Sequence, residues 1–199
     1  MNAPTPDEQD THDMARLAGG HDAALDELMD RHAEKLFHYL VRSLRNETDA
    51  ADLAQEAFVR VYQNRAKFDP NQRFVTWLYA IASNLVRDRY RWRSRHPQVS
   101  LEAANEQTGT NLNDKLPSHE RTPDEHLEIE EQAIAIRQAV AALPAELRQP
   151  LILAVYEELP QAEIAAILNC SVKAVETRIY RARQQLRATL ASAVRTGLP

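Results

Sequence analysis

Residues 160–187 constrain the fold of this chain more than any other stretch. They read PQAEIAAILNCSVKAVETRIYRARQQLR, a pattern typical of two short helices joined by a tight turn. Pro160 suits the first turn of a helix, which does not need its amide hydrogen. Asn169 stands where the chain must turn, and asparagine tolerates the left-handed backbone region well. Ser171 can cap the second helix. The stretch therefore predicts a helix-turn-helix unit, with nucleic acid as the expected ligand.

The second of these helices has two chemically different sides at 100° per residue. One side is apolar and should face the core: Val172, Val175, Ile179, Ala182 and Leu186. The opposite side carries Lys173, Ala174, Thr177, Tyr180, Arg181 and Gln184, with Arg178 on one edge and Glu176, Arg183 and Arg187 on the other. An apolar back and a basic, hydrogen-bonding front suit the major groove of DNA. The alternative is a solvated amphipathic helix that only covers a core.

The composition favours an all-helical protein. The 199 residues include only four glycines, and helix-forming Ala, Leu, Arg, Glu and Gln are abundant. The net charge of −5 argues at first against a nucleic-acid partner, but the charge is unevenly distributed. Residues 1–30 carry −7, 31–95 carry +6, 96–136 carry −7 and 137–199 carry +3. Two basic segments thus alternate with two acidic ones.

Several classes of site are not expected. The single cysteine, Cys170, excludes an internal disulfide, and the seven histidines form no ligand-spaced set, so no metal site is predicted. No nucleophile–base pair or phosphate loop is visible, so we expect no catalytic residues, no cofactor and no enzyme activity. Without a signal peptide or a long apolar run, the protein is expected to be soluble and cytoplasmic, without membrane insertion.

The chain divides into four expected segments. Residues 1–20 are predicted to be a disordered acidic tail. Residues 21–96 and 133–194 are predicted to be two small helical domains, and 97–132 a flexible acidic linker. A helix start is nevertheless legible at Thr122–Glu125, TPDE, which has the form of a capping box with proline at the first helical position. The long polar linker predicts that the two domains move relative to each other until a partner fixes them.

The segment Phe74–Arg95, FVTWLYAIASNLVRDRYRWRSR, is a second candidate nucleic-acid surface. Its expected buried side is Leu78, Ile81, Ala82, Leu85 and Val86, and its expected outer side is Ala80, Ser83, Asn84, Arg87 and Arg91. Arginine neutralises phosphate, and aromatic faces stack on exposed bases. Alternatively, Trp77 and Trp92 belong to the core and the arginines only solubilise the helix end.

The preceding helix, DAADLAQEAFVRVYQ at 49–63, carries a different stripe. Its members are Asp52, Gln55, Glu56, Val59 and Gln63. A polar stripe with an apolar residue at its centre is more typical of a protein-docking surface than of a DNA face. An ordinary solvated face is the alternative.

Taken together, these motifs resemble the bacterial RNA polymerase sigma factors of the extracytoplasmic-function group in the sigma-70 family. The matching stretches are DAADLAQEAFVRVYQ, FVTWLYAIASNLVRDRYRWR, ALPAELRQPLIL and ELPQAEIAAILNCSVKAVETRIYRARQQL, in the order of the family. The resemblance implies that 21–96 is sigma domain 2 and 133–194 is sigma domain 4. It also implies promoter-specific transcription initiation with core RNA polymerase, in a stress or envelope-signal response.

The resemblance further implies a role for each surface. Asp52, Gln55, Glu56 and Val59 would dock on the clamp coiled coil of the largest polymerase subunit, and the second domain on the flap of the second largest. The loop Lys67–Phe74 would hold a flipped base of the minus-10 element. Beside it, Trp77, Asn84, Arg87 and Arg91 would lie on the DNA. Lys173, Ala174, Thr177, Arg178, Arg181 and Gln184 would read the minus-35 element. An anti-sigma factor is a possible further partner.

A stand-alone helix-turn-helix regulator is the competing hypothesis. In that case the N-terminal region would be a sensor or a dimerisation module. The arginine–aromatic segment and the stripe at Asp52 argue against it, because a sensor needs neither.

Overall fold

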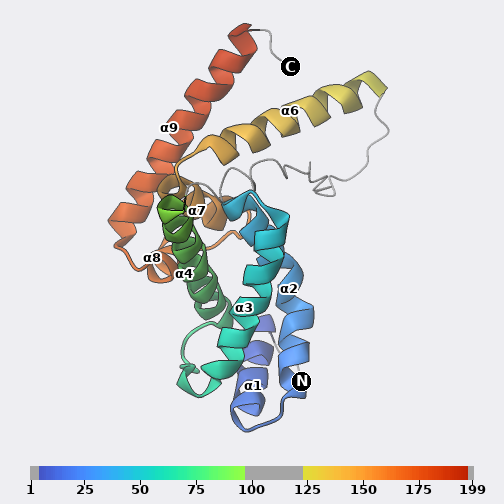
Figure 1. Ribbon diagram of the computed structural model, residues 1–199, viewed down its shortest axis with the longest axis vertical. Helices are drawn as coiled ribbons and strands as arrows, with labels where there is room; N and C mark the ends of the chain where they lie inside the picture. The colour runs from blue at the N-terminus through green and yellow to red at the C-terminus, as the bar shows by residue number, and fades with distance from the viewer. Residues whose placement is uncertain (1–4, 97–122, 197–199) are drawn as a thin grey trace.

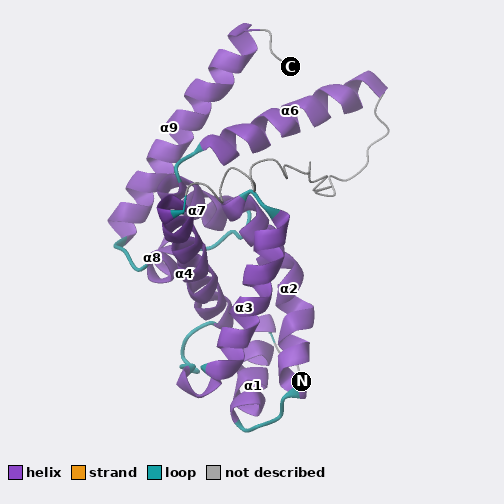
Figure 2. Cartoon of the chain, in the orientation of Figure 1, coloured by secondary structure: helices purple, strands orange, loops and turns teal. Residues whose placement is uncertain are grey.

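The computed structural model describes residues 5–96 and 123–196, with side chains described for 5–96 and 132–192. Figure 2 shows helices joined by loops across these ranges. The first lobe contains α1 (Pro6–Ala18), α2 (Ala23–Leu44), α3 (Glu47–Gln63), the 3-10 helix η1 (Arg65–Lys67) and α4 (Phe74–Arg95). The second lobe contains α6 (Pro123–Ala142), α7 (Ala145–Val155), α8 (Gln161–Leu168) and α9 (Val172–Thr196). The expected all-helical architecture is confirmed for the described residues.

Helix α1 corrects the prediction of a disordered tail. Thr5 caps it: the Glu8 amide donates to Thr5 Oγ1 at 3.4 Å, and the Thr5 amide donates to Glu8 Oε2 at 2.8 Å. Met14 and Leu17 are buried against α2. The acidic residues of α1 are partnered as well. Buried Asp10 and Asp13 accept from Arg31 of α2 at 3.0 and 2.6 Å. Arg31 on the neighbouring helix thus compensates the buried part of the acidity that indicated a solvated tail.

The core of the first lobe lies between α2, α3 and α4. Its largest fully buried side chains include Leu36, Tyr39, Leu40, Phe74 and Leu78. Ser83, expected on the outer side of α4, is instead fully buried. Its hydroxyl oxygen lies 2.7 Å from the hydroxyl oxygen of Tyr39, within hydrogen-bond distance. That hydrogen bond satisfies two polar groups inside the core, which is the condition for burying them.

The core of the second lobe joins α7, α8 and α9. Ile152, Leu153, Ile164, Val175 and Ala182 are buried there. The turn between α8 and α9 has the predicted chemistry. Asn169 adopts the left-handed conformation, with φ 50° and ψ 56°, and the Ala174 amide donates to Ser171 Oγ at 3.2 Å. Pro160 differs slightly from expectation, because it precedes α8 as its N-cap residue.

The two lobes pack against each other, which corrects the expectation that they move independently until a partner fixes them. Figure 1 shows α8 beside α4, and contacts also join α7 to α2. Helix α6 begins at Pro123, as the capping pattern predicts, so residues 123–132 are helical rather than part of a flexible linker. The rest of the expected linker, 97–122, lies outside the described residues.

No helix in the described ranges is long and apolar enough to cross a membrane. Among the described residues, no group of three His, Cys, Asp or Glu side chains could hold a metal ion.

Candidate nucleic-acid interface

Helix α9 presents the predicted basic face to solvent. Val175, Ile179 and Ala182 are buried, as the helical periodicity predicts, and Leu186 packs partly against them. On the other side, Lys173, Tyr180, Arg181 and Gln184 are exposed, while Ala174, Thr177 and Arg178 are half-buried. Val172 departs from the prediction: it is 42% exposed, because it begins the helix at the edge of the packed region.

Contacts within this face already order several side chains. Lys173 pairs with Glu176 at 2.9 Å, which raises the pKa of the Lys173 ammonium. Gln184 donates to the Tyr180 hydroxyl at 3.2 Å, and Thr177 donates to the Lys173 carbonyl at 2.8 Å. Glu176 therefore neutralises a neighbouring lysine in the free chain. A DNA phosphate would compete with it for that lysine.

Helix α4 carries a narrower exposed track. Asn84 and Arg91 are exposed and Arg87 is half-buried. Arg87 donates to Asn84 Oδ1 at 3.1 Å, which sets the two side chains beside each other. Two other arginines of this segment have a structural role, since Arg89 and Arg93 both pair with Asp49 of α3. Part of the arginine run therefore fixes α4 to α3, and only part is available to a ligand.

The loop before α4 is backed by an aromatic cluster. Phe74 is fully buried, with its ring centroid 6.2 Å from Phe68 and 6.4 Å from Trp77. In this arrangement Phe74 has no surface to offer a base, contrary to its expected place on the DNA. Phe68 and Trp77 are half-buried, and their ring centroids lie 5.3 Å apart. Lys67 is exposed and donates to Asn64 Oδ1 at 3.0 Å.

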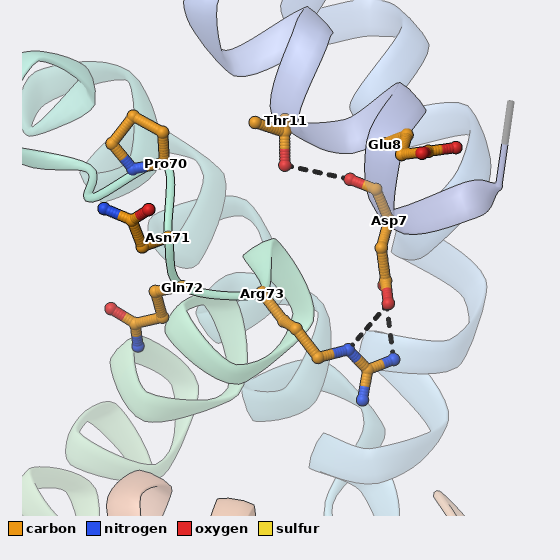
Figure 3. Close-up of a pocket in the computed structure, with 7 residues that line it drawn as sticks. All are labelled: Asp7, Glu8, Thr11, Pro70, Asn71, Gln72 and Arg73. Carbon is orange, nitrogen blue, oxygen red and sulfur yellow. Dashed lines mark hydrogen bonds and ion pairs between the residues drawn. The ribbon is translucent and has the colours of Figure 1, made fainter.

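A hollow of about 390 Å³ lies between this loop and α1 (Figure 3). Pro70, Asn71, Gln72 and Arg73 form one wall, and Asp7, Glu8 and Thr11 form the other. Sequence reasoning missed the second wall because it assigned residues 1–20 to a tail. The signal was present, however. Residues 5–8 read TPDE, the same pattern that predicts the start of α6 at 122–125.

The stripe on α3 is available for a protein partner. Asp52 and Gln55 are exposed, Glu56 is half-buried, and Val59 is an exposed apolar residue at 46%. Glu56 accepts a hydrogen bond from Arg60 at 2.8 Å. The predicted docking residues thus share one outward side of α3.

Comparisons with known proteins agree with this division of the chain. The family described as Sigma-70 region 2 matches residues 28–96, and Sigma-70, region 4 matches 133–186. The ECF RNA polymerase sigma factor SigW of Bacillus subtilis is 36% identical over 172 residues, which cover 86% of this chain and 91% of SigW. The sigma factor CnrH of Cupriavidus metallidurans is 33% identical over 185 residues, 93% of this chain and 96% of CnrH.

The fold also matches a solved structure. The structure of CnrH in complex with the cytosolic domain of CnrY aligns with a TM-score of 0.65, over 93% of this chain and 99% of that chain. Identity in that alignment is 28%. On the strength of these relatives and both family matches, the chain belongs to the extracytoplasmic-function group of the sigma-70 family of RNA polymerase sigma factors.

Proposed function

We propose that this chain is the subunit that binds core RNA polymerase and directs promoter-specific initiation. One observation carries the proposal: the chain holds two separate candidate nucleic-acid faces, on α4 and on α9, in the two segments that match sigma regions 2 and 4. A third, polar face on α3 supplies a place for the polymerase. The role needs binding surfaces and no catalytic group, and it is exercised in the cytoplasm, where the polymerase transcribes.

In this proposal α9 reads the minus-35 element in the major groove. Its reading residues are Lys173, Ala174, Thr177, Arg178, Arg181 and Gln184, which lie on the side of α9 away from its core. The recognition helix of a helix-turn-helix unit enters the major groove in this manner, and arginine and lysine there pair with guanine.

The first lobe acts on the minus-10 element. Asn84, Arg87 and Arg91 follow the strand, while Lys67, Trp77 and the hollow beside the loop receive an unstacked base. Extruding a base costs a few kcal/mol, which a fitted pocket and a stacking partner must offset. Buried Phe74 supports Phe68 and Trp77 rather than contacting the base.

Two kinds of protein partner follow from the proposal. Asp52, Gln55, Glu56 and Val59 dock on the clamp coiled coil of the largest polymerase subunit, and the second lobe docks on the flap of the second largest. An anti-sigma factor is a further proposed partner, because the CnrH structure holds the cytosolic domain of CnrY. Release from such an inhibitor would connect the chain to a stress or envelope signal.

The competing function, a stand-alone helix-turn-helix regulator, is not favoured. It would leave the match of residues 28–96 to sigma region 2 without a role.

Reconstitution with core polymerase tests the proposal. The purified chain is added to core enzyme and a library of genomic promoter fragments, and transcripts are mapped. We expect initiation at a defined set of fragments, with weak duplex binding by the chain alone. Tight, specific duplex binding without polymerase, combined with no effect on transcription, would contradict the proposal.

A further inference from the structure

Arg73 lies at the meeting point of three elements. It precedes α4, and its guanidinium contacts α1 on one side and α8 on the other. Arg73 Nε and Nη2 donate to the Asp7 carboxylate at 2.8 and 3.2 Å (Figure 3). Arg73 Nη1 donates to both Glu163 oxygens, at 2.8 and 3.0 Å. Two carboxylates on one cation leave an excess of negative charge at this point.

The site that holds the Glu163 carboxylate has the chemistry of a phosphate site. Thr76 donates its hydroxyl to Glu163 Oε2 at 2.8 Å, alongside the Arg73 donor. Arg73 is the N-cap residue of α4 and its side chain makes no cap hydrogen bond, so the positive end of the helix dipole lies beside these donors and favours an anion there. A planar guanidinium, a hydroxyl and a helix N-terminus are the groups that hold phosphate oxygens in proteins.

The arrangement of the lobes cannot persist on a promoter. Elements at minus 35 and minus 10 are separated by about 25 base pairs, or roughly 85 Å at about 3.4 Å per base pair. A compact chain of 199 residues has a radius of gyration of about 16 Å. The lobes must therefore separate before α4 and α9 can reach both elements, and Glu163 then leaves Arg73 with α8.

We propose that Arg73 and Thr76 form a contact for a DNA backbone phosphate at the start of α4, and that Glu163 of the second lobe, together with Asp7, occupies it in the free chain. This phosphate contact rests on the proposed minus-10 role of the first lobe, and its occupation by Glu163 and Asp7 would regulate when the first lobe binds DNA. The occupant is easily exchanged. The Arg73 and Asp7 side chains are 43% and 45% exposed, and ion pairs of such exposure contribute little stability in water. The Glu163 side chain is more enclosed, at 22% exposed, but it leaves with α8 when the lobes separate.

Binding of single-stranded DNA by the free chain tests the proposal. Because a phosphate contact is independent of sequence, the probe is a fluorescent random-sequence 15-mer, followed by anisotropy at several salt concentrations. The test variant is Asp7→Asn/Glu163→Gln. Its matched control, Asp26→Asn/Glu146→Gln, removes one exposed negative charge from each lobe at places away from Arg73.

The test variant should bind the 15-mer roughly tenfold more tightly than the control, as a newly available charge-assisted contact would allow. Its plot of log affinity against log salt should be steeper by about 0.7, the contribution of one neutralised phosphate on a single strand. Adding Arg73→Gln should abolish both changes. Equal gains in test and control variants, or a gain that survives Arg73→Gln, would overturn the proposal.

The result is separable from the initiation assay. If the wild-type chain directs polymerase but the variant shows no gain, the phosphate site is overturned and the promoter role stands. If the Arg73-dependent gain is found but polymerase is not directed, the phosphate site stands and the promoter role fails.

Discussion

The two candidate DNA faces differ in how accessible they are to solvent in the free chain. The face on α9 is open to solvent, with Tyr180 64% exposed and a single lysine paired to Glu176. The start of α4 lies under α8, its arginine is held by two carboxylates, and its leading aromatic, Phe74, is fully buried. The difference indicates that double-stranded DNA has access to the free chain at α9, whereas the contact at Arg73 and Thr76 becomes accessible only when the lobes separate.

The largest expected difference between the two faces is in the free energy of unfolding when an aromatic residue of each, buried Phe74 or exposed Tyr180, is replaced by alanine. Phe74→Ala should lower the free energy of unfolding by about 3–5 kcal/mol, the usual cost of removing a buried phenyl group. Tyr180→Ala, on the exposed face, should change it by less than about 0.5 kcal/mol. Urea unfolding followed by circular dichroism measures both. Similar losses for the two variants would remove the contrast between the faces.

Arg178 tests whether the exposed face of α9 reads bases. In the free chain this half-buried arginine donates to Cys170 Sγ at 3.5 Å, a weak contact that DNA can replace. With polymerase bound, Arg178→Ala should reduce discrimination at one minus-35 base pair by about 1–3 kcal/mol. Competition between promoter fragments with single substitutions measures it. A uniform loss on all fragments would make Arg178 a phosphate contact instead.

The smallest expected effect is a pH dependence of the contact between the lobes. Tyr79 of α4 donates to Glu157 Oε2 at 2.5 Å, and burial raises the pKa of the Glu157 carboxyl above its ordinary value. Separation of the lobes would expose this carboxyl and restore the ordinary pKa. The packed arrangement therefore holds the proton more tightly, and it should strengthen as the pH falls from neutrality toward the ordinary pKa of a glutamate.

Glu157→Gln provides the control for that effect. Arg42, Lys35 and His38 also face the carboxyl. The population of packed chains should become nearly independent of pH in this variant, as measured by the distance between labels on the two lobes. An unchanged dependence would show that the Glu157 carboxyl does not carry the effect.

The sequence predicted the second lobe more accurately than the first. The fold of residues 160–187 is determined locally, by apolar residues at helical spacing, a turn asparagine and a capping serine. Asn169 and Ser171 take the expected roles. Helix α1 could not be inferred from charge, because Asp10 and Asp13 are neutralised by α2, more than fifteen residues away along the chain. Its capping pattern at 5–8 was the usable signal.

The masking of α4 lies beyond what sequence periodicity can predict. Helical periodicity gives no sign that Arg73, the residue before α4, and Glu163 of α8 meet. Their contact arises from how one lobe packs on the other, across ninety residues of sequence. Ser83 shows the same limit within a lobe, since its partner Tyr39 lies on another helix. Such pairings depend on tertiary packing rather than on local pattern.

The distance between the lobes tests the central claim most directly. Spin labels at Glu34→Cys on α2 and Ala188→Cys on α9, both exposed positions, are introduced into a Cys170→Ser chain and measured by pulsed electron resonance. We predict one narrow distribution in the free chain and a clearly longer distance when core polymerase and promoter DNA are bound. Identical distributions in the two states, or a broad distribution in the free chain, would contradict the claim that packing of the lobes covers Arg73 and Thr76 at the start of α4.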